Sequence, residues 1–507
     1  MIDINVGILW NEHKITGELK GSFAAQWRTE PDGWIKLDNL TGSFTAVAVE
    51  TQYEQQWAIR LAETLNIKAA EGILETIRNV TSHYDMEILE AGRVWQTASG
   101  EYDNRVWWPI IKLKSLADAE PALVELRAIS TVNPLGFEII SLDKAAPSTR
   151  FLMTIGERPT EEMFELVVRP LSDDACFMLN DVPIGRGFHW EHKKALSYRG
   201  ELRLFQPEGR LLTAVNKLPL ETYLESTVGS EMRSDLPQAF AQAQAIAARS
   251  TVMATAGRHH YADGFDLCND DHCQCYQGII REAESVSNPV RQTAGQVLTW
   301  QGRVADTRYA KCCGGVSEYY ESVWGPQGPD CFEVKSCGDF PLPDLTKEQE
   351  ARAFLSSDPD CYCNPGKHPY PQPWDDDQQF RWYGQYTPAE LGRIIYKKTG
   401  VDVGSVRNLR IRRRGKSGRV LILSVEGSVQ TLKLFGELHI RRALAESTMP
   451  SSFFIVDYEG GKIKITGGGW GHGVGLCQLG AVAMANQGKK LNDILAFYYP
   501  GAELKGS

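Results

Sequence analysis

The sequence lacks the long apolar run that a membrane-spanning helix requires, because no stretch approaches about 20 consecutive apolar residues. Positive charge is not in excess either: 54 Lys and Arg stand against 64 Asp and Glu, giving a formal net charge of −10. Internal repeats and coiled-coil heptads are also missing. These absences exclude a transmembrane helix, a repeat architecture and nucleic-acid binding through a basic face. The local basic stretch at 407–419 predicts a solvated strand and turn.

The first residues lack the basic start and the small-residue cleavage site of a secretory signal peptide. Their pattern predicts a strand instead. A cytoplasmic chain and an exported chain whose leader has been removed both agree with this start, so the localisation stays open.

Cysteine is scarce outside one region. Nine of the 11 cysteines lie between Cys268 and Cys363, whereas Cys176 and Cys477 stand alone. This clustering favours metal ligation over a disulfide framework that spans the whole protein.

A chain of 507 residues with 42% hydrophobic residues is expected to form two to four globular domains. Strand and helix patterns alternate, which predicts an α+β fold with an alanine-rich helical core, antiparallel strands and an N-terminal α/β accessory module. The predicted regions are a strand region at 1–50, an accessory or inserted α/β module at 51–150, the first half of the core at 151–330, an irregular Cys- and Pro-rich segment at 331–380, and the second half of the core at 381–507.

The core is expected to centre on an alanine-rich helix at 237–256. Asp235 is a suitable N-cap, and Pro237 suits the first turn because the missing N–H costs little there. The small alanine side chains let other elements approach this helix closely.

A glycine-rich loop at 467–480 carries His472. The loop matches neither the P-loop nor the dinucleotide-binding pattern. Because glycines let a backbone approach a ligand closely, His472 is a candidate binding residue. It could equally hold the loop by bonding a neighbouring carbonyl. Trp470 beside it could stack on a sugar or base, or pack in the core.

Glu231 lies between an apolar segment and the start of the alanine-rich helix. Desolvation there would raise its pKa and suit it to act as an acid near neutral pH. The alternative is a carboxylate that only interacts with the helix dipole.

The segment 259–275 combines histidines and cysteines, which are ligands that zinc prefers. Its spacing is not that of a zinc finger, and free or disulfide-bonded cysteines are the alternative. Three further groups could form a second site or disulfides: Cys312–Cys313, Cys331/Cys337 and Cys361/Cys363.

Three blocks together resemble the SpoIID/LytB family of stage II sporulation protein D and amidase enhancers. The first is 220–250 with VGSEM and the alanine-rich helix, the second is 266–278 (DLCNDDHCQCYQG), and the third is 471–481 (GHGVGLCQLGA) with YYPG at 498–501. CCGGVSE at 312–318 adds a fourth match. The resemblance spans about residues 200–505 and leaves 51–150 outside.

The resemblance implies a lytic transglycosylase that cleaves the MurNAc–GlcNAc strands of peptidoglycan. Glu231 would protonate the glycosidic oxygen and then deprotonate the sugar's own 6-hydroxyl, which closes a 1,6-anhydro ring without water. No second carboxylate is then needed, unlike in ordinary glycosidases, and the matched blocks suggest none. Two alternatives are a non-catalytic glycan-binding module that stimulates a cell-wall amidase, and a hydrolase with a catalytic zinc in the Cys/His cluster.

The resemblance also implies the remaining site residues. Sugar binding would involve Arg249, Gln274, Tyr276, Trp470, His472, Gly473 and Gln478. A zinc ion would be held by His260, Cys268, His272 and Cys273, with Cys275 departing from the family pattern. Such a closed ligand set makes the zinc structural. Peptidoglycan lies outside the membrane, which implies an extracytoplasmic site of action.

Overall fold

A computed structural model describes the chain except residues 1, 31–32, 82, 98–99, 130–136, 189, 233–235, 326–330, 370–378 and 507. The fold is mixed α+β with mainly antiparallel sheets, as the sequence predicted. None of the helices in the described ranges is long and apolar enough to cross a membrane.

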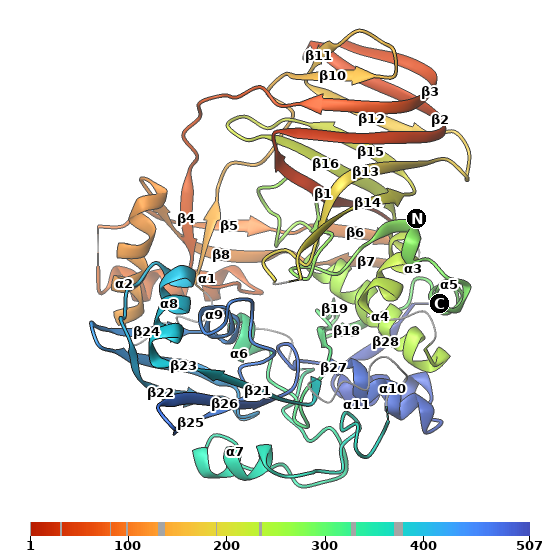
Figure 1. Cartoon of the computed structure of the whole chain (residues 1–507). Helices are drawn as coiled ribbons and strands as arrows, with labels where there is room; N and C mark the ends of the chain where they lie inside the picture. The colour runs from red at the N-terminus through yellow and green to blue at the C-terminus, as the bar shows by residue number, and fades with distance from the viewer. Residues whose placement is uncertain are drawn as a thin grey trace.

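The largest element is a sheet of eleven described strands at the top of Figure 1. Alternate side chains point into its core; Ile4, Val6 and Ile8, for example, are fully buried. The described strands of the first 47 residues pair with strands from 151–219, so they are part of this sheet and not a separate region. The strands are β1 (Asp3–Glu12), β2 (Lys14–Glu30), β3 (Gly33–Val47), β10 (Phe151–Ile155), β11 (Glu161–Met163), β12 (Glu165–Pro170), β13 (Cys176–Ile184), β14 (His192–Tyr198), β15 (Glu201–Phe205), β16 (Leu212–Pro219) and β17 (Leu267–Cys268).

An α/β module is inserted between β3 and β10. These two strands pair directly, with Val47 opposite Leu152, so the chain leaves the sheet and returns to it at one place. The module has its own apolar core, which includes Ile59, Leu74 and Ile111. Its elements are β4 (Trp57–Arg60), α1 (Ile67–Arg78), β5 (Met86–Ala91), β6 (Val94–Thr97), β7 (Gly100–Asp103), β8 (Val106–Leu113), α2 (Ala119–Ala128) and β9 (Glu138–Ser141).

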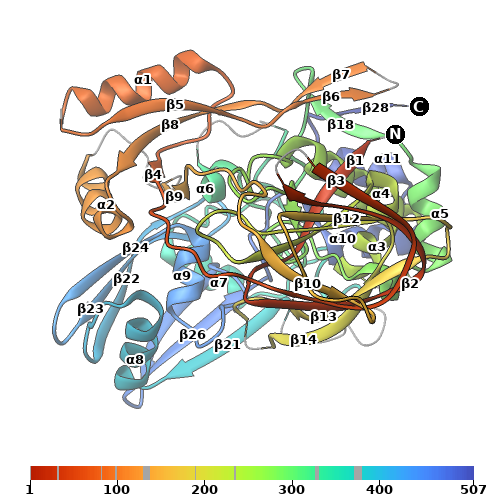
Figure 2. The ribbon, with the colours of Figure 1, turned by 90° about the horizontal axis from the view of Figure 1, so that it is seen from above.

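The alanine-rich helix is confirmed as α4 (Gln238–Thr255) and lies among the other core helices in Figures 1 and 2. Pro237 precedes the helix as its N-cap, not in the first turn, and Asp235 lies outside the described residues. The elements around α4 are α3 (Leu220–Glu231), α5 (Glu284–Gln292), β18 (Val297–Trp300), β19 (Arg303–Val304), β20 (Tyr309–Ala310), α6 (Glu321–Trp324), β27 (Leu476–Cys477), α10 (Gln478–Asn486), α11 (Leu491–Tyr498) and β28 (Glu503–Lys505).

A C-terminal unit at 381–468 has a core of its own, which includes Trp382, Leu423 and Ile465. It is therefore not the second half of the central core; the chain rejoins that core only after β26. The segment predicted to be irregular contains α7. Helix α7 (Glu348–Leu355) lies in the segment before the unit. The elements of the unit itself are β21 (Arg381–Tyr386), α8 (Pro388–Thr399), β22 (Val406–Arg414), β23 (Val420–Gly427), β24 (Thr431–Phe435), α9 (Glu437–Ala443), β25 (Phe454–Glu459) and β26 (Lys462–Gly468).

Helix α3 is fixed against α4 by an ion pair whose arginine is buried. The guanidinium of Arg249 on α4 is 1% exposed and donates to both oxygens of Glu221 on α3, at 2.9 and 2.6 Å. It also donates to the carbonyl of Gln296 at 3.1 Å. Ten residues of helix separate Glu221 from Glu231, which is about 15 Å at 1.5 Å per residue. The ion pair therefore anchors the first turn of α3, whereas Glu231 is the last residue of this helix.

Replacing Glu221 by Gln is expected to lower the free energy of unfolding by about 3 kcal/mol, the low end for a broken buried pair, since Glu221 is itself 32% exposed. The measurement is urea unfolding of the full chain. Glu225→Gln on the same helix is the matched control, because its partner Arg291 is 51% exposed; it should cost less than about 1 kcal/mol. Equal effects of the two substitutions would rule out the anchoring role.

Candidate active site

Glu231, the predicted acid, is half-buried at the end of α3. Its Oε1 accepts hydrogen bonds from the main-chain N–H of Cys275 at 2.8 Å and from the Tyr309 hydroxyl at 3.2 Å. Gly229 allows this end of the helix to approach its neighbours closely, since a Cβ there would lie 2.3 Å from the carbonyl oxygen of Arg281. The site is thus assembled from α3, the loop after β17, and β20.

Burial raises the pKa of the Glu231 carboxyl to about 7, and the nearby charge of Asp271 acts in the same direction. The Cys275 N–H, the Tyr309 hydroxyl and the Lys311 ammonium lower this pKa but do not cancel the effect of burial. A carboxyl with such a pKa keeps its proton in a large fraction of molecules at neutral pH, as a general acid must. The expectation that the matched blocks hold no second carboxylate near Glu231 is corrected by Asp271.

Tyr309 connects Glu231 to the glycine-rich loop. Strand β20 pairs in parallel with β27, with Tyr309 opposite Leu476, so the tyrosine lies beside the end of the loop. His472 shares a hydrogen bond with the backbone of Tyr309, and its Nδ1 accepts the N–H of Val474 at 3.0 Å. The acid and the predicted loop histidine therefore flank the same tyrosine.

His472 is held as a neutral ring. Burial lowers its pKa well below the usual value, and nearby arginines, above all Arg308, add to this. The ring packs edge-on against Trp324, with the ring centroids 4.8 Å apart. A ring that is neutral at physiological pH and bonded to its own loop is suited to positioning and not to proton donation.

Gly473 is the point where the glycine-rich loop passes directly over a buried arginine. It has a φ of +75°, and a Cβ there would lie 2.1 Å from the guanidinium of Arg419. That arginine is fully buried and donates to the carbonyls of Cys313 and Val316. The Gly473 carbonyl accepts the N–H of Glu318 at 2.9 Å. The implied sugar contact of Gly473 is therefore corrected: the residue is buried and its lack of a side chain makes room for Arg419.

Arg249 and Gln478, which the resemblance assigned to sugar binding, are also buried. Arg249 is committed to Glu221, at the end of α3 away from the acid. Gln478 is 3% exposed and donates to Gln244 on α4 at 3.3 Å. Both side chains join elements of the core, which corrects their implied place in a cleft.

Gln274 and Tyr276 are likewise core residues. Gln274 accepts from the Tyr223 hydroxyl at 3.1 Å and donates to the Ala248 carbonyl at 3.1 Å. The Tyr276 hydroxyl donates to Asn216 at 2.8 Å. These bonds hold the loop that presents the N–H of the intervening residue to Glu231, so their role is to position the loop and not to contact sugar.

Trp470 remains accessible. Its main chain pairs with Cys312 in both directions, at 2.8 and 3.1 Å. Its side chain is half-buried and packs against the edge of the central core. It is therefore a packing residue whose side chain stays partly exposed.

The four predicted metal ligands do come together: the ligand atoms of His260, Cys268, His272 and Cys273 all lie within 4.8 Å of one another. The buried Nε2 of His260 has no hydrogen-bond partner among the described residues, and its Nδ1 bonds Asp263 at 2.8 Å. A histidine oriented in this way by a carboxylate is typical of metal sites.

Cys275 is not part of this group. Its Sγ lies 2.9 Å from Oδ1 of Asp271, and its N–H bonds Glu231. The departure of Cys275 from the family pattern therefore does not disturb the ligand set. The residues that are present fit a zinc ion with two sulfur and two nitrogen ligands.

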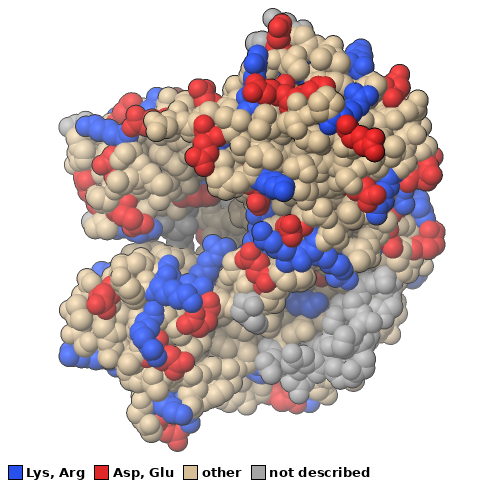
Figure 3. All heavy atoms as spheres, turned by 45° about the horizontal axis from the view of Figure 1, so that its top comes forward, with Lys and Arg blue, Asp and Glu red and all other residues tan. Residues whose placement is uncertain are grey.

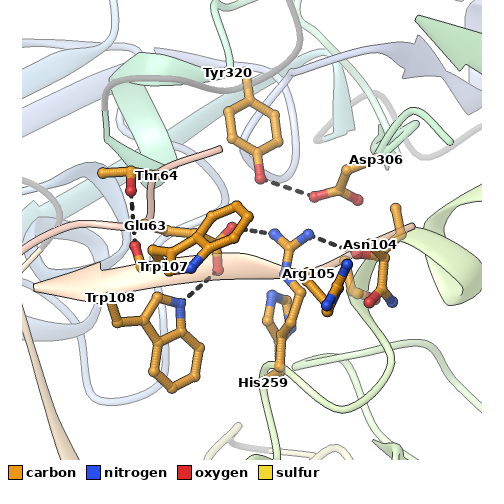
Figure 4. A network of polar contacts seen from close by, with 12 residues as sticks. Glu63, Thr64, Asn104, Arg105, Trp107, Trp108, His259, Asp306 and Tyr320 are labelled. Carbon is orange, nitrogen blue, oxygen red and sulfur yellow. Dashed lines mark hydrogen bonds and ion pairs between the residues drawn. The ribbon is translucent and has the colours of Figure 1, made fainter. Parts of the chain in front are cut away.

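A network of buried charges joins the inserted module to the core behind the loop (Figure 4). Glu63 of the module pairs with Arg258 and accepts from the indole of Trp108 at 3.2 Å. Burial alone would raise the pKa of Glu63, but Arg258 and Arg60 outweigh it and lower that pKa. The module is thus attached to the core by ionic contacts.

On the core side of this network, Asp306 accepts from the Tyr320 hydroxyl and from Arg308, each at 2.8 Å. Arg308 in turn lies 4.6 Å from the ring centroid of Trp324, the residue that packs against His472. The space-filling view shows a hollow in this part of the molecule, between the module and the C-terminal unit, with basic side chains along its lower edge (Figure 3).

Tyr309 and Lys311 were not predicted as site residues from the sequence. They directly precede the matched block at 312–318, and β20 is too short to show strand periodicity. Trp324 lies inside the span 200–505 that resembles the family, but it showed no chemistry until folding placed it against His472.

Two comparisons with family models cover separate parts of the chain. Residues 208–300 match the model described as stage II sporulation protein, SpoIID. Residues 333–475 match a domain of unknown function, DUF8618. The second match covers most of the C-terminal unit and the cysteine-rich segment before it.

Several known proteins are similar over more than half of the chain. An uncharacterised protein of Brachyspira hyodysenteriae is 27% identical over 309 residues, covering 61% of this chain and 72% of that protein. Stage II sporulation protein D of Bacillus subtilis is 25% identical over 307 residues, covering 57% and 76%. The amidase enhancer of the same organism is 23% identical over 289 residues, covering 55% and 40%. These matches confirm the resemblance to the SpoIID/LytB family, with the SpoIID model matching residues 208–300, the stretch that contains Glu231 and the Cys/His loop.

Proposed function

We propose that this protein is a lytic transglycosylase that cleaves the MurNAc–GlcNAc strands of peptidoglycan and leaves 1,6-anhydro-MurNAc ends. The observation that carries the proposal is Glu231, a half-buried carboxyl whose pKa is raised to about 7 and which is oriented through one oxygen. The similarity to stage II sporulation protein D supports a role in cell-wall processing. Such a substrate places the protein at the cell envelope.

The proposed reaction uses Glu231 twice. First, the protonated carboxyl gives its proton to the glycosidic oxygen as the bond from that oxygen to C1 of MurNAc breaks and positive charge develops at C1. The resulting carboxylate then takes the proton of the MurNAc 6-hydroxyl as its oxygen bonds to C1. Glu231 ends the cycle protonated, so no water and no second nucleophile are consumed.

The surroundings of Glu231 suit both protonation states that this cycle uses. The Cys275 N–H and the Tyr309 hydroxyl both bind Oε1. They stabilise the carboxylate after the first proton transfer, while burial favours the protonated start. Trp470 and His472, both half-buried on the same loop, are the residues we assign to contact with the glycan.

A second candidate function is a non-catalytic module that binds glycan and stimulates a cell-wall amidase. The observation in its favour is the similarity to the amidase enhancer of Bacillus subtilis. The two functions differ in whether the proton of Glu231 is required.

Glu231→Gln is expected to reduce the release of 1,6-anhydro-MurNAc products from denuded glycan strands by about 10²- to 10⁴-fold, the usual contribution of a general acid. Product formation is followed by mass spectrometry of the released fragments. Glu225→Gln, on the same helix but facing Arg291, is the matched control and should leave the rate unchanged.

Equal product formation by both variants would remove Glu231 from the acid role. If the unmodified protein releases no anhydro products but stimulates a purified amidase, and Glu231→Gln stimulates it equally, the enhancer function replaces the lyase.

The pH dependence of kcat/KM is expected to show activity lost as the pH rises through about 7, since the reactive form of Glu231 is the protonated one. Tyr309→Phe removes a hydrogen bond that lowers this pKa. The alkaline limb should therefore move to higher pH in the variant. A limb that does not move, or that moves to lower pH, contradicts this assignment.

We also propose that His260, Cys268, His272 and Cys273 hold one structural zinc ion. With four protein ligands the ion would be closed to substrate, and it would supply order to the loop that presents the Cys275 N–H to Glu231. It takes no part in the proton transfers.

Cys268→Ser together with Cys273→Ser is expected to lower the zinc content by one ion per chain and to lower Tm, because the loop loses its cross-link. Zinc is measured by elemental mass spectrometry and Tm by calorimetry. Cys176→Ser, in the large sheet, is the control. Unchanged zinc would refute the ligand set, and lyase activity that tracks zinc in a chain of unchanged Tm would make the metal catalytic.

A further inference from the structure

We infer that Cys313, Cys337, Cys363 and Cys477 form a second zinc site, a closed tetrathiolate separate from the Cys/His group. All four side chains are buried, and their Sγ atoms lie within 4.8 Å of one another. The grouping takes one member from each cysteine pair seen in the sequence and adds Cys477, which stands alone there.

The distances fit one tetrahedral ion. Zn–S bonds of about 2.3 Å place the sulfur atoms about 3.8 Å apart in a tetrahedron. The Sγ atoms of Cys313 and Cys363 are 3.6 Å apart. A disulfide requires about 2.05 Å. An iron–sulfur cluster contains several iron ions, so its cysteines must stand further apart than ligands that share one ion.

The surroundings suit the charge of such a site. Four thiols release four protons when they bind Zn²⁺, so the site carries a net charge of −2. The Cys313 N–H donates to Sγ of Cys477 at 3.3 Å, and the Tyr498 hydroxyl lies 3.6 Å from Sγ of Cys337. Cys477 is also the N-cap of α10, where the helix dipole favours negative charge.

The site would join segments that lie far apart in the sequence and meet in the central apolar core. Cys313 follows β20 and Cys477 opens α10, so both belong to the central core. Cys337 and Cys363 lie in stretches of the domain matched at 333–475 where the described residues form few regular elements. One ion would therefore cross-link this domain to the core on either side of the glycine-rich loop, whose Trp470 pairs with Cys312.

The same core provides a matched control. Cys361 is fully buried, and its Sγ lies 3.9 Å from that of Cys363, but it is not a member of the four. A thiol that is equally buried and adjacent, yet outside the ligand set, separates loss of a ligand from loss of packing.

The experiment uses the full chain, purified with reducing agent, in the Cys268→Ser/Cys273→Ser background that removes the first group. One zinc ion per chain is expected by elemental mass spectrometry. X-ray absorption at the zinc edge should show four sulfur neighbours at about 2.3 Å and no nitrogen. Adding Cys337→Ser should lower the zinc content from one ion to none, whereas adding Cys361→Ser should leave it at one.

Three results would overturn the inference: a chain without metal whose thiols are free or joined as disulfides, bound iron with visible charge-transfer absorption, or equal loss of zinc with Cys337→Ser and Cys361→Ser. If Cys337→Ser prevents folding, the absorption spectrum of the background protein decides, because it leaves the second group intact. Every readout is metal content or coordination, so the result does not depend on the lyase proposal.

Discussion

The bidentate pair between Arg249 and Glu221 is the contact on which the geometry around Glu231 depends. A buried guanidinium tolerates few positions for its partner, so the pair fixes α3 against α4. The far end of α3 then presents Glu231 where the Cys275 N–H and the Tyr309 hydroxyl meet it. The ion pair itself lies away from the Glu231 carboxyl, which accepts hydrogen bonds from neutral donors and keeps a raised pKa because it is partly desolvated.

Around the glycine-rich loop, too, buried charged side chains hold the site residues in place from behind. Arg419 fills the space beneath Gly473 and ties the loop to the carbonyls of the cysteine block. On the side of the inserted module, Trp324 packs against His472, and Arg308 lies over the ring of Trp324. Buried arginines therefore shape the site without entering it, and they add to the burial that lowers the pKa of His472. A rigid, preformed wall of this kind suits a reaction that must keep one acid oriented through two proton transfers.

Local chemistry was visible in the sequence wherever a short segment carries it. The alanine-rich helix, the Cys/His ligand set and the acid at the end of α3 depend on neighbouring residues, and each was predicted. Residues such as Arg249, Gln274 and Tyr276 were misassigned, because a motif shows that a polar side chain matters but not whether it faces solvent or the core. Their hydrogen bonds to Glu221, Ala248 and Asn216 show that these side chains face the core.

The sequence by itself determined the fold class and the resemblance to the SpoIID/LytB family, and that resemblance led to Glu231 and the first Cys/His group as candidate site residues. Only the tertiary structure decided that β1, β2 and β3 complete a sheet with strands from 151–219, that Tyr309 lies between Glu231 and His472, and that Cys477 joins three distant cysteines. These contacts link residues up to 216 positions apart (219 − 3) in the first case and 164 in the last (477 − 313). Packing of whole elements, and not any local preference, creates such contacts.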